Sequence, residues 1–264
     1  MDFLDVIRSE SARFSALARQ LAPQAPVPTC PGWTGADLVY HLAEVQDFWA
    51  YVAVGSDGED VAPLPRPENP AALPGLFDDA SRRLATALAG ADPGDACWSW
   101  DDDGHHVGWV LRRQAHEALI HRVDAELAAG VPVTPVADEL AADGVDEILA
   151  VMVAGVPGWS SFHPDGAAVR LEVADGAQAG RSWTLRVGRF RGVGPDSGRE
   201  WDLPAAELTE DPATARTAVP LVGGAWELDR WLWGRGTLAT LEALEPEQRA
   251  VAEGFRAMVA ATTQ

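Results

Sequence analysis

The sequence predicts an α+β protein, in which a four-helix bundle is followed by a smaller domain of mixed strands and helices. Between residues 2 and 129, apolar residues recur every three or four positions in four stretches, as in amphipathic helices. After residue 158 apolar residues alternate with polar ones, which is typical of half-buried strands. A chain of 264 residues is long enough for two domains, each with its own core.

The helices of the bundle are delimited by proline-rich and glycine-rich segments. The stretch APQAPVPTCPGWT cannot continue a helix and separates the first helix from the second. Thr34 is a good N-cap for the second helix, with Asp37 three residues later as a variant of the capping box. Gly130 is expected to end the fourth helix. The predicted helices are 2–22, a segment from Thr34 to about Val52, 74–90 and 107–129.

The remaining elements follow the same patterns. A further helix is expected over 136–153 and is expected to pack against the bundle, so that residues 1–154 form the first domain and 155–264 the second. The predicted strands of the second domain are 167–174, 181–188 and 214–222, and its predicted helices are 224–235 and 246–261.

Composition narrows the possible partners and the compartment. Twenty basic and 40 acidic residues give a net charge of −20, which repels nucleic acid and anionic lipid. Cys30 and Cys97 are too few for a disulfide framework. There is no apolar run of about 18 residues to span a bilayer, and MDFLDVIRSE lacks the basic start of a signal peptide. We expect a cytoplasmic protein without nucleic-acid or membrane partners, and the oligomeric state stays open.

The candidate site lies on two of the predicted helices. Glu117, His121 and Asp124 in RRQAHEALIHRVDAE share one helical face, because residues four and seven apart lie on the same side. His41 lies on the apolar face of the second helix. If the two helices face each other, His41, Glu117 and His121 can converge. Two imidazoles and a carboxylate are a ligand set that suits a divalent metal such as zinc, with the fourth position open.

Structural interpretations of the same residues are also possible. An inward histidine is often only hydrogen-bonded in the core, and a Glu–His pair four residues apart is often a weak surface ion pair. Asp124 either accepts a hydrogen bond from a ligand imidazole or pairs with an arginine. His105 and His106 are disfavoured as ligands because adjacent side chains diverge. Cys30 has no basic neighbour in the sequence, which favours a small buried side chain over a nucleophile.

Two motifs, VPTCPGWTGADLVYHLAEV and RRQAHEALIHRVDAELAAG, resemble the actinobacterial mycothiol-dependent maleylpyruvate isomerase family of DinB-like metal-dependent bundles. The likeness covers nearly the whole chain, including ELDRWLWGR near the end. It implies a DinB-like bundle followed by a sterol-carrier-like domain. The family's metal ligands fall on His41, Glu117 and His121, its aspartate on Asp124 and, by a looser match, its activity-linked arginine on Arg235.

The resemblance implies a metal-dependent enzyme, with zinc as the ion and mycothiol as the thiol cosubstrate. Such an enzyme activates the thiol for cis–trans isomerisation of, or transfer to, a small electrophile such as a maleylpyruvate-like acid. Arg235, between Gly234 and Gly236, either binds a substrate carboxylate or pairs with the dipole at a helix C-terminus. Two alternatives remain: a non-catalytic small-molecule-binding or regulatory protein, and a hydrolase that uses zinc-bound water.

Overall fold

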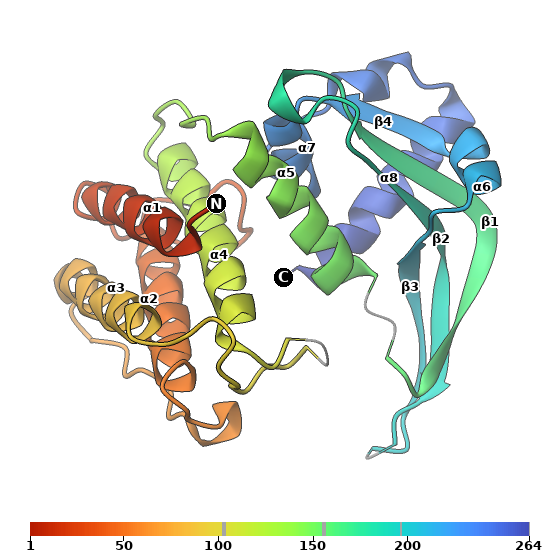
Figure 1. Ribbon diagram of the computed structural model, residues 1–264. Coiled ribbons are helices and arrows are strands. Elements are labelled where there is room, and N and C mark those ends of the chain that lie inside the picture. Colours follow the sequence, from red (N-terminus) through yellow and green to blue (C-terminus); the bar gives the residue numbers. More distant parts are fainter. Residues whose placement is uncertain (102–103, 155–156, 196, 264) are drawn as a thin grey trace. The chain divides into compact units, whose positions relative to one another are not determined.

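The computed structural model describes residues 1–101, 104–154, 157–195 and 197–263. Its contacts divide the chain into two compact units, Met1–Thr134 and Pro135–Gln264. The first unit is helical and the second combines a sheet with helices, so the predicted α+β class is confirmed (Figure 1). Among the described residues, none of the helices has the length and apolar character needed to cross a bilayer.

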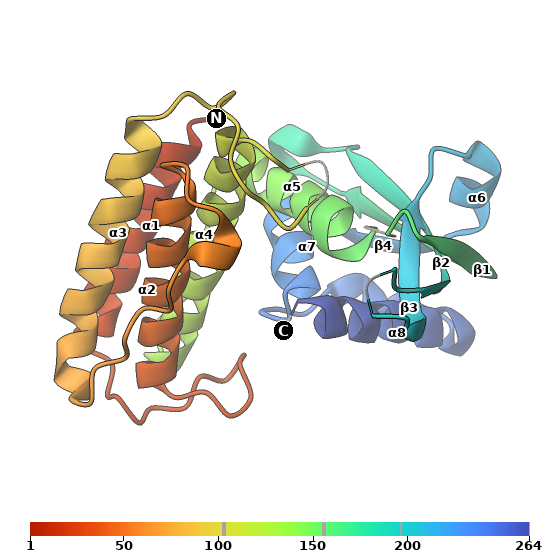
Figure 2. The ribbon, with the colours of Figure 1, turned by 90° about the horizontal axis from the view of Figure 1, so that it is seen from below.

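Four long helices form the first unit and lie side by side (Figure 2). The connection between the second and third is long and contains only two short 3-10 turns, Gly58–Asp60 and Pro70–Ala72. The helices are α1 Phe3–Ala18, α2 Gly35–Val52, α3 Leu73–Ala89 and α4 Val107–Ala128. Each begins and ends within a few residues of the predicted position.

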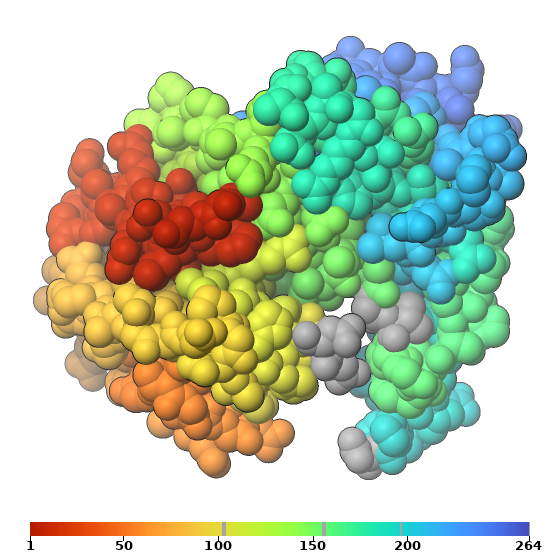
Figure 3. All heavy atoms as spheres, in the orientation of Figure 1, coloured from red at the N-terminus to blue at the C-terminus, as the bar shows by residue number. Residues whose placement is uncertain are grey.

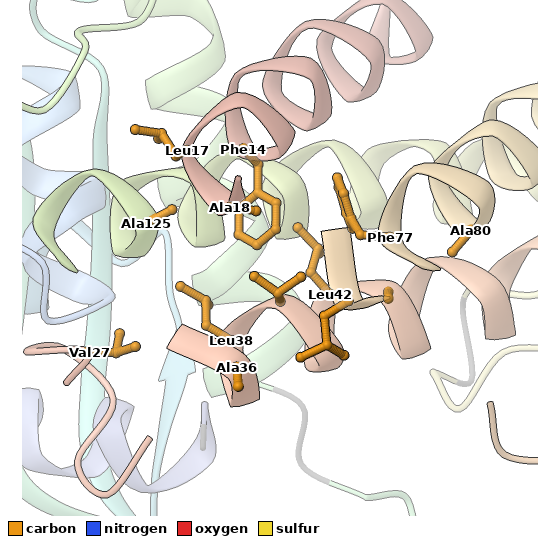
Figure 4. Packing of buried hydrophobic residues seen from close by; sticks show 13 residues of the cluster. Phe14, Leu17, Ala18, Val27, Ala36, Leu38, Leu42, Phe77, Ala80 and Ala125 are labelled. Carbon is orange, nitrogen blue, oxygen red and sulfur yellow. The ribbon is translucent and has the colours of Figure 1, made fainter. Parts of the chain in front are cut away.

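Aromatic and aliphatic side chains from all four helices fill the centre of the bundle. Phe14 of α1 and Phe77 of α3 are fully buried, with ring centroids 4.7 Å apart. Leu38 and Leu42 of α2 pack into the same cluster (Figure 4). Because these rings hold α1 against α3, the two helices lie side by side at the molecular surface (Figure 3). Burial of each such side chain contributes about 1.5–3 kcal/mol.

The start of α2 is fixed by the capping box that the sequence predicts. The Thr34 hydroxyl accepts the backbone N–H of Asp37, and the Asp37 carboxylate accepts the backbone N–H of Thr34 at 2.9 Å. Two N–H groups at the helix end are thereby satisfied. This cap fixes the start of α2, two turns before His41.

The second unit contains a four-stranded sheet in the order β3-β2-β1-β4. β1 pairs antiparallel with β2 and parallel with β4, and α8 contacts both β1 and β4. Val169, Leu171 and Val173 alternate along β1 with less buried neighbours and are buried, as the pattern predicts. The elements are α5 Asp138–Glu147, β1 Ser160–Val173, β2 Ser182–Val193, β3 Glu200–Leu208, α6 Pro212–Thr217, β4 Val219–Gly223, α7 Ala225–Leu232 and α8 Pro246–Thr262.

The sheet unit differs from the prediction in two further elements besides β1 and β2, which are longer than predicted because β1 begins at Ser160 and β2 ends at Val193. β3 was not predicted, because Pro204 interrupts its apolar pattern; as an edge strand it tolerates a proline. The segment 214–222 was predicted as one strand, but its first part belongs to α6. Asp211 caps that helix and Pro212 occupies its first turn, so the chain forms a helical turn before β4 begins.

The division between the units also differs from the predicted one, which lay between residues 154 and 155. The predicted helix 136–153 forms α5 and continues as a π-helical segment, Ile148–Val153. Asp146 of α5 accepts a hydrogen bond from the Trp183 indole of β2 at 2.9 Å, and Gly144 lies against Asp229 of α7. These contacts place α5 in the second unit, so the boundary falls after Thr134 and the two units are of nearly equal length, 134 and 130 residues (264 − 134).

Candidate metal centre

Helices α2 and α4 bring His41, Glu117 and His121 together, as predicted for facing helices. The Glu117 Oε1 atom lies 3.3 Å from His41 Nε2 and 3.1 Å from His121 Nε2. One ligand atom from each residue lies within 4.8 Å of the others. The two imidazole rings are edge to face with centroids 4.8 Å apart. His41 and His121, 80 positions apart in the chain (121 − 41), thus share one carboxylate oxygen of Glu117.

The separations of Glu117 Oε1 from the two nitrogens suit a small cation. Two ligands about 2.0–2.1 Å from a tetrahedral ion lie roughly 3.3 Å apart, close to the 3.3 and 3.1 Å found here. Two imidazole nitrogens and a carboxylate oxygen are ordinary zinc ligands. The side chain of His41 is 32% exposed, whereas that of His121 is 8% exposed. The cluster is therefore open to solvent on the His41 side, where a small molecule can approach.

Asp124 lies directly behind His121. Its Oδ2 atom is 2.9 Å from His121 Nδ1, and its side chain is fully buried. A carboxylate at this nitrogen selects the tautomer with a proton on Nδ1 and leaves Nε2 free as a ligand atom. This contact agrees with the first of the two roles considered for Asp124, in which its carboxylate accepts a hydrogen bond from the imidazole of a metal ligand.

Three further contacts were not predicted from the sequence. Arg113, one turn before Glu117, donates to Glu117 Oε2 at 3.0 Å; the spacing of four residues was visible in the sequence. Trp33 packs against both histidine rings, with centroids 4.8 Å from His41 and 6.2 Å from His121. Thr29 donates its hydroxyl to Asp124. Trp33 and Thr29 come from the α1–α2 loop, which has no periodic pattern to predict their direction.

The charges of the cluster are strongly coupled. Burial opposes ionisation of Glu117, but the charge and hydrogen bond of His121, the hydrogen bond of His41 and the charge of Arg113 hold its pKa well below the usual value. Burial likewise disfavours a charged His121, yet Glu117 and Asp124 outweigh it and raise the pKa of His121 to about 9. Glu117 is thus an ionised carboxylate at neutral pH, as a metal ligand must be, whereas His121 carries a second proton that a bound metal would have to displace from Nε2.

The other candidate residues lie elsewhere. The His106 ring accepts the backbone N–H of Trp109 and caps α4, and neither His105 nor His106 belongs to the cluster found among the described residues. Cys30 is half-buried rather than buried, and its thiol donates to Asp124 Oδ2 at 3.6 Å.

Arg235 belongs to the second unit. It follows Gly234, whose φ of +80° favours glycine, and its guanidinium donates to the backbone carbonyl of Trp233 just past α7. Burial and the nearby charge of Arg235 lower the pKa of Arg256. The carbonyl contact fits the helix-terminus role. A carboxylate-binding role for Arg235 stays a prediction.

Comparisons with known proteins agree on the fold. A search of curated proteins found no match. Two crystal structures, of the mycothiol-dependent maleylpyruvate isomerase and of a histidine-to-alanine mutant of it, each match with a TM-score of 0.55 and 16% identity over 89% of this chain and 88% of theirs. At this identity the likeness establishes the fold.

The family model for the mycothiol maleylpyruvate isomerase N-terminal domain matches residues 4–126. This range contains His41, Glu117, His121 and Asp124. The N-terminal domain of this chain therefore belongs to the family of mycothiol maleylpyruvate isomerase N-terminal domains.

Proposed function

We propose that this protein is a metal-dependent enzyme that activates a low-molecular-weight thiol for cis–trans isomerisation of, or transfer to, a small electrophile. Mycothiol is the proposed thiol, zinc the proposed ion and a maleylpyruvate-like acid the proposed electrophile. The observation that carries the proposal is the convergence of His41, Glu117 and His121 within 4.8 Å, in a domain of this family.

The residues of the cluster have distinct roles in this proposal. His41, Glu117 and His121 would hold the ion by Nε2, a carboxylate oxygen and Nε2. A bound divalent cation would supply a positive charge that keeps a coordinating thiol ionised at neutral pH. Arg113 pairs with the second oxygen of the Glu117 carboxylate, and Asp124 would keep the proton of His121 on Nδ1. The open His41 side gives the thiol and the electrophile a path of approach.

The proposed reaction needs the thiol as a nucleophile. An ionised thiol adds to a carbon–carbon double bond conjugated to a carbonyl group, and the former double bond then rotates as a single bond. The addition leaves the electron pair of the double bond on the carbonyl group as an enolate. Loss of the same thiolate restores the double bond in the other geometry, whereas in a transferase the enolate takes up a proton from water and the adduct is released. Arg235 is proposed to bind a carboxylate of the electrophile through its planar fork.

Metal analysis tests the proposal directly. The purified wild-type chain is expected to contain about one zinc ion, as three-ligand sites do, and His41→Ala and His121→Ala are expected to lose it. His163→Ala is the matched control, because His163 is exposed on β1 of the second unit, where its Nε2 atom lies 3.0 Å from the Ser161 hydroxyl. A wild-type chain saturated with zinc in the buffer but carrying none after desalting would contradict the proposal.

Thermal-shift measurements then separate the activity from its alternatives. Stabilisation by mycothiol that requires zinc supports the thiol-dependent enzyme. Stabilisation by small acids with no response to thiol or zinc supports a binding protein. Ester hydrolysis that needs zinc but no thiol supports a hydrolase.

A further inference from the structure

The buried carboxylate of Asp124 is held at both oxygen atoms. Thr29 donates its hydroxyl to Oδ1, while His121 Nδ1 lies 2.9 Å from Oδ2 and the Cys30 thiol 3.6 Å from it. Asp124 is fully buried, and a buried carboxylate is costly unless it accepts hydrogen bonds. The terminal torsion of an aspartate is broad and roughly two-fold. A contact at Oδ2 alone would therefore let the carboxylate turn, and the contact at Oδ1 prevents this.

Backbone hydrogen bonds define the conformation of the loop that carries Thr29. Val27 and Trp33 are joined by a backbone hydrogen bond of 3.0 Å, and Cys30 bonds through its backbone to both of them. Gly32 supplies the positive φ, +84°, that the turn requires. None of these bonds uses the Thr29 side chain, so the hydroxyl is available for Asp124 without being needed to form the loop.

We propose that Thr29 is a positioning residue of the metal centre: its hydroxyl fixes the Asp124 carboxylate, which in turn fixes the ring of His121 with Nε2 toward Glu117. The inference rests on the proposed function, because it assigns Thr29 to the support of a ligand. Residues that hydrogen-bond the groups behind a metal ligand, without touching the metal, tune the metal affinity of the site by orienting that ligand.

Substitutions of similar shape test the hydroxyl itself. Thr29→Val removes the donor and keeps the branched side chain, whereas Thr29→Ser keeps the donor. Zinc affinity, measured by competition with a chromophoric chelator, is expected to fall about tenfold in Thr29→Val, at the low end for partners of ligand residues. Thr29→Ser is expected to bind zinc as the wild type does.

The same helix offers a matched control. Thr134 donates its hydroxyl to Glu126 at 2.6 Å, and Glu126 is also a fully buried carboxylate of α4. Glu126 pairs with Arg122 rather than with a proposed ligand. Thr134→Val therefore removes an equivalent hydrogen bond and is expected to lower the melting temperature of the metal-free protein while leaving the zinc affinity unchanged.

A second measurement reports on the orientation of His121. In the zinc-loaded protein, the Nδ1–H proton of His121 is expected as a slowly exchanging NMR signal in wild type and Thr29→Ser, and as a weakened or shifted one in Thr29→Val. Wild-type affinity and an unchanged His121 signal in Thr29→Val would overturn the inference, even if that variant melts at a lower temperature. A wild-type chain that binds no zinc would instead overturn the proposed function.

Discussion

Buried ionisable side chains of α4 form two sets with different partners. Glu126 accepts from Arg122, Arg13 and Thr134, which are the donors that a fully buried carboxylate needs. Glu117 instead places one oxygen between two histidine rings on different helices. A buried charge on a helix is therefore not in itself a sign of a site. The partners of the charged group determine whether it stabilises the fold or belongs to a cluster of possible ligand atoms.

Glu126→Gln is expected to destabilise the protein in a pH-dependent way. Removing one partner of a buried ion pair costs about 3 kcal/mol. Burial opposes ionisation of Glu126, but Thr134 and Arg122 outweigh it and lower its pKa from 4.5. The stabilisation is therefore fully present above pH 4.5 and is lost as the pH falls through the lowered pKa. Denaturant titrations should show a large deficit at pH 7 that shrinks in acid.

Asp79→Asn is the control for this prediction. Asp79 pairs with Arg82 on the exposed surface of α3, and such pairs contribute only about 0–1 kcal/mol. A deficit for Glu126→Gln no larger than that of Asp79→Asn at pH 7 would show that the network around Arg122 does not brace the bundle.

The residues of the site were predictable to different degrees. Helical periodicity was enough to place Glu117 and His121 on one face of a helix and His41 on the apolar face of another, but their convergence was predicted only on the condition that the two helices face each other. Thr29 and Asp124 are 95 residues apart. No local rule relates a loop residue to a helix that far along the chain, because only the tertiary packing brings them together.

At the scale of elements, the cap of α2 stabilises the first turn of the helix, whereas the buried Leu38 and Leu42 hold the part that carries His41. Thr34→Ala removes the side-chain acceptor of the capping box and is expected to cost about 1 kcal/mol. This corresponds to a fall of about 2–8 °C in melting temperature for a domain of this size. The measurement is a thermal melt of the metal-free protein.

The same substitution also distinguishes local fraying from displacement of the whole helix. Leu38 and Leu42 remain buried beside His41, so zinc affinity is expected to change little in Thr34→Ala. A large loss of zinc affinity with an unchanged melting temperature would contradict this view of the cap.

Elements with strong local signals were predicted well, and those without them were not. Periodicity and capping residues marked the bundle helices, and alternation marked β1 and β2. β3 carries a proline and polar flanks, and its place at the sheet edge depends on pairing with β2, which the sequence does not display. The sequence predicted that α5 is a helix. Its amphipathic pattern does not specify whether its apolar face packs against the bundle or against the second unit.

At the scale of the whole molecule, the three proposed ligands and their supports come from one compact unit. His41, Glu117, His121, Asp124 and Thr29 all precede Pro135. A fragment consisting of residues 1–134 is therefore expected to fold into a helical domain and to bind zinc as tightly as the full chain. Circular dichroism and chelator competition provide the measurements. A folded fragment that binds no zinc, beside a full chain that does, would show that the second unit is required.

The sharing of Glu117 between two helices has a consequence for biosynthesis. His41 emerges from the ribosome long before Glu117 and His121, which lie 76 and 80 residues later on α4 (117 − 41 and 121 − 41). A nascent chain that ends within α3 offers a cation only one of the three donors. If the cluster holds an ion as proposed, the ion can be captured only after α4 has been synthesised and has docked against α2, so that it would be acquired late in the folding of the bundle.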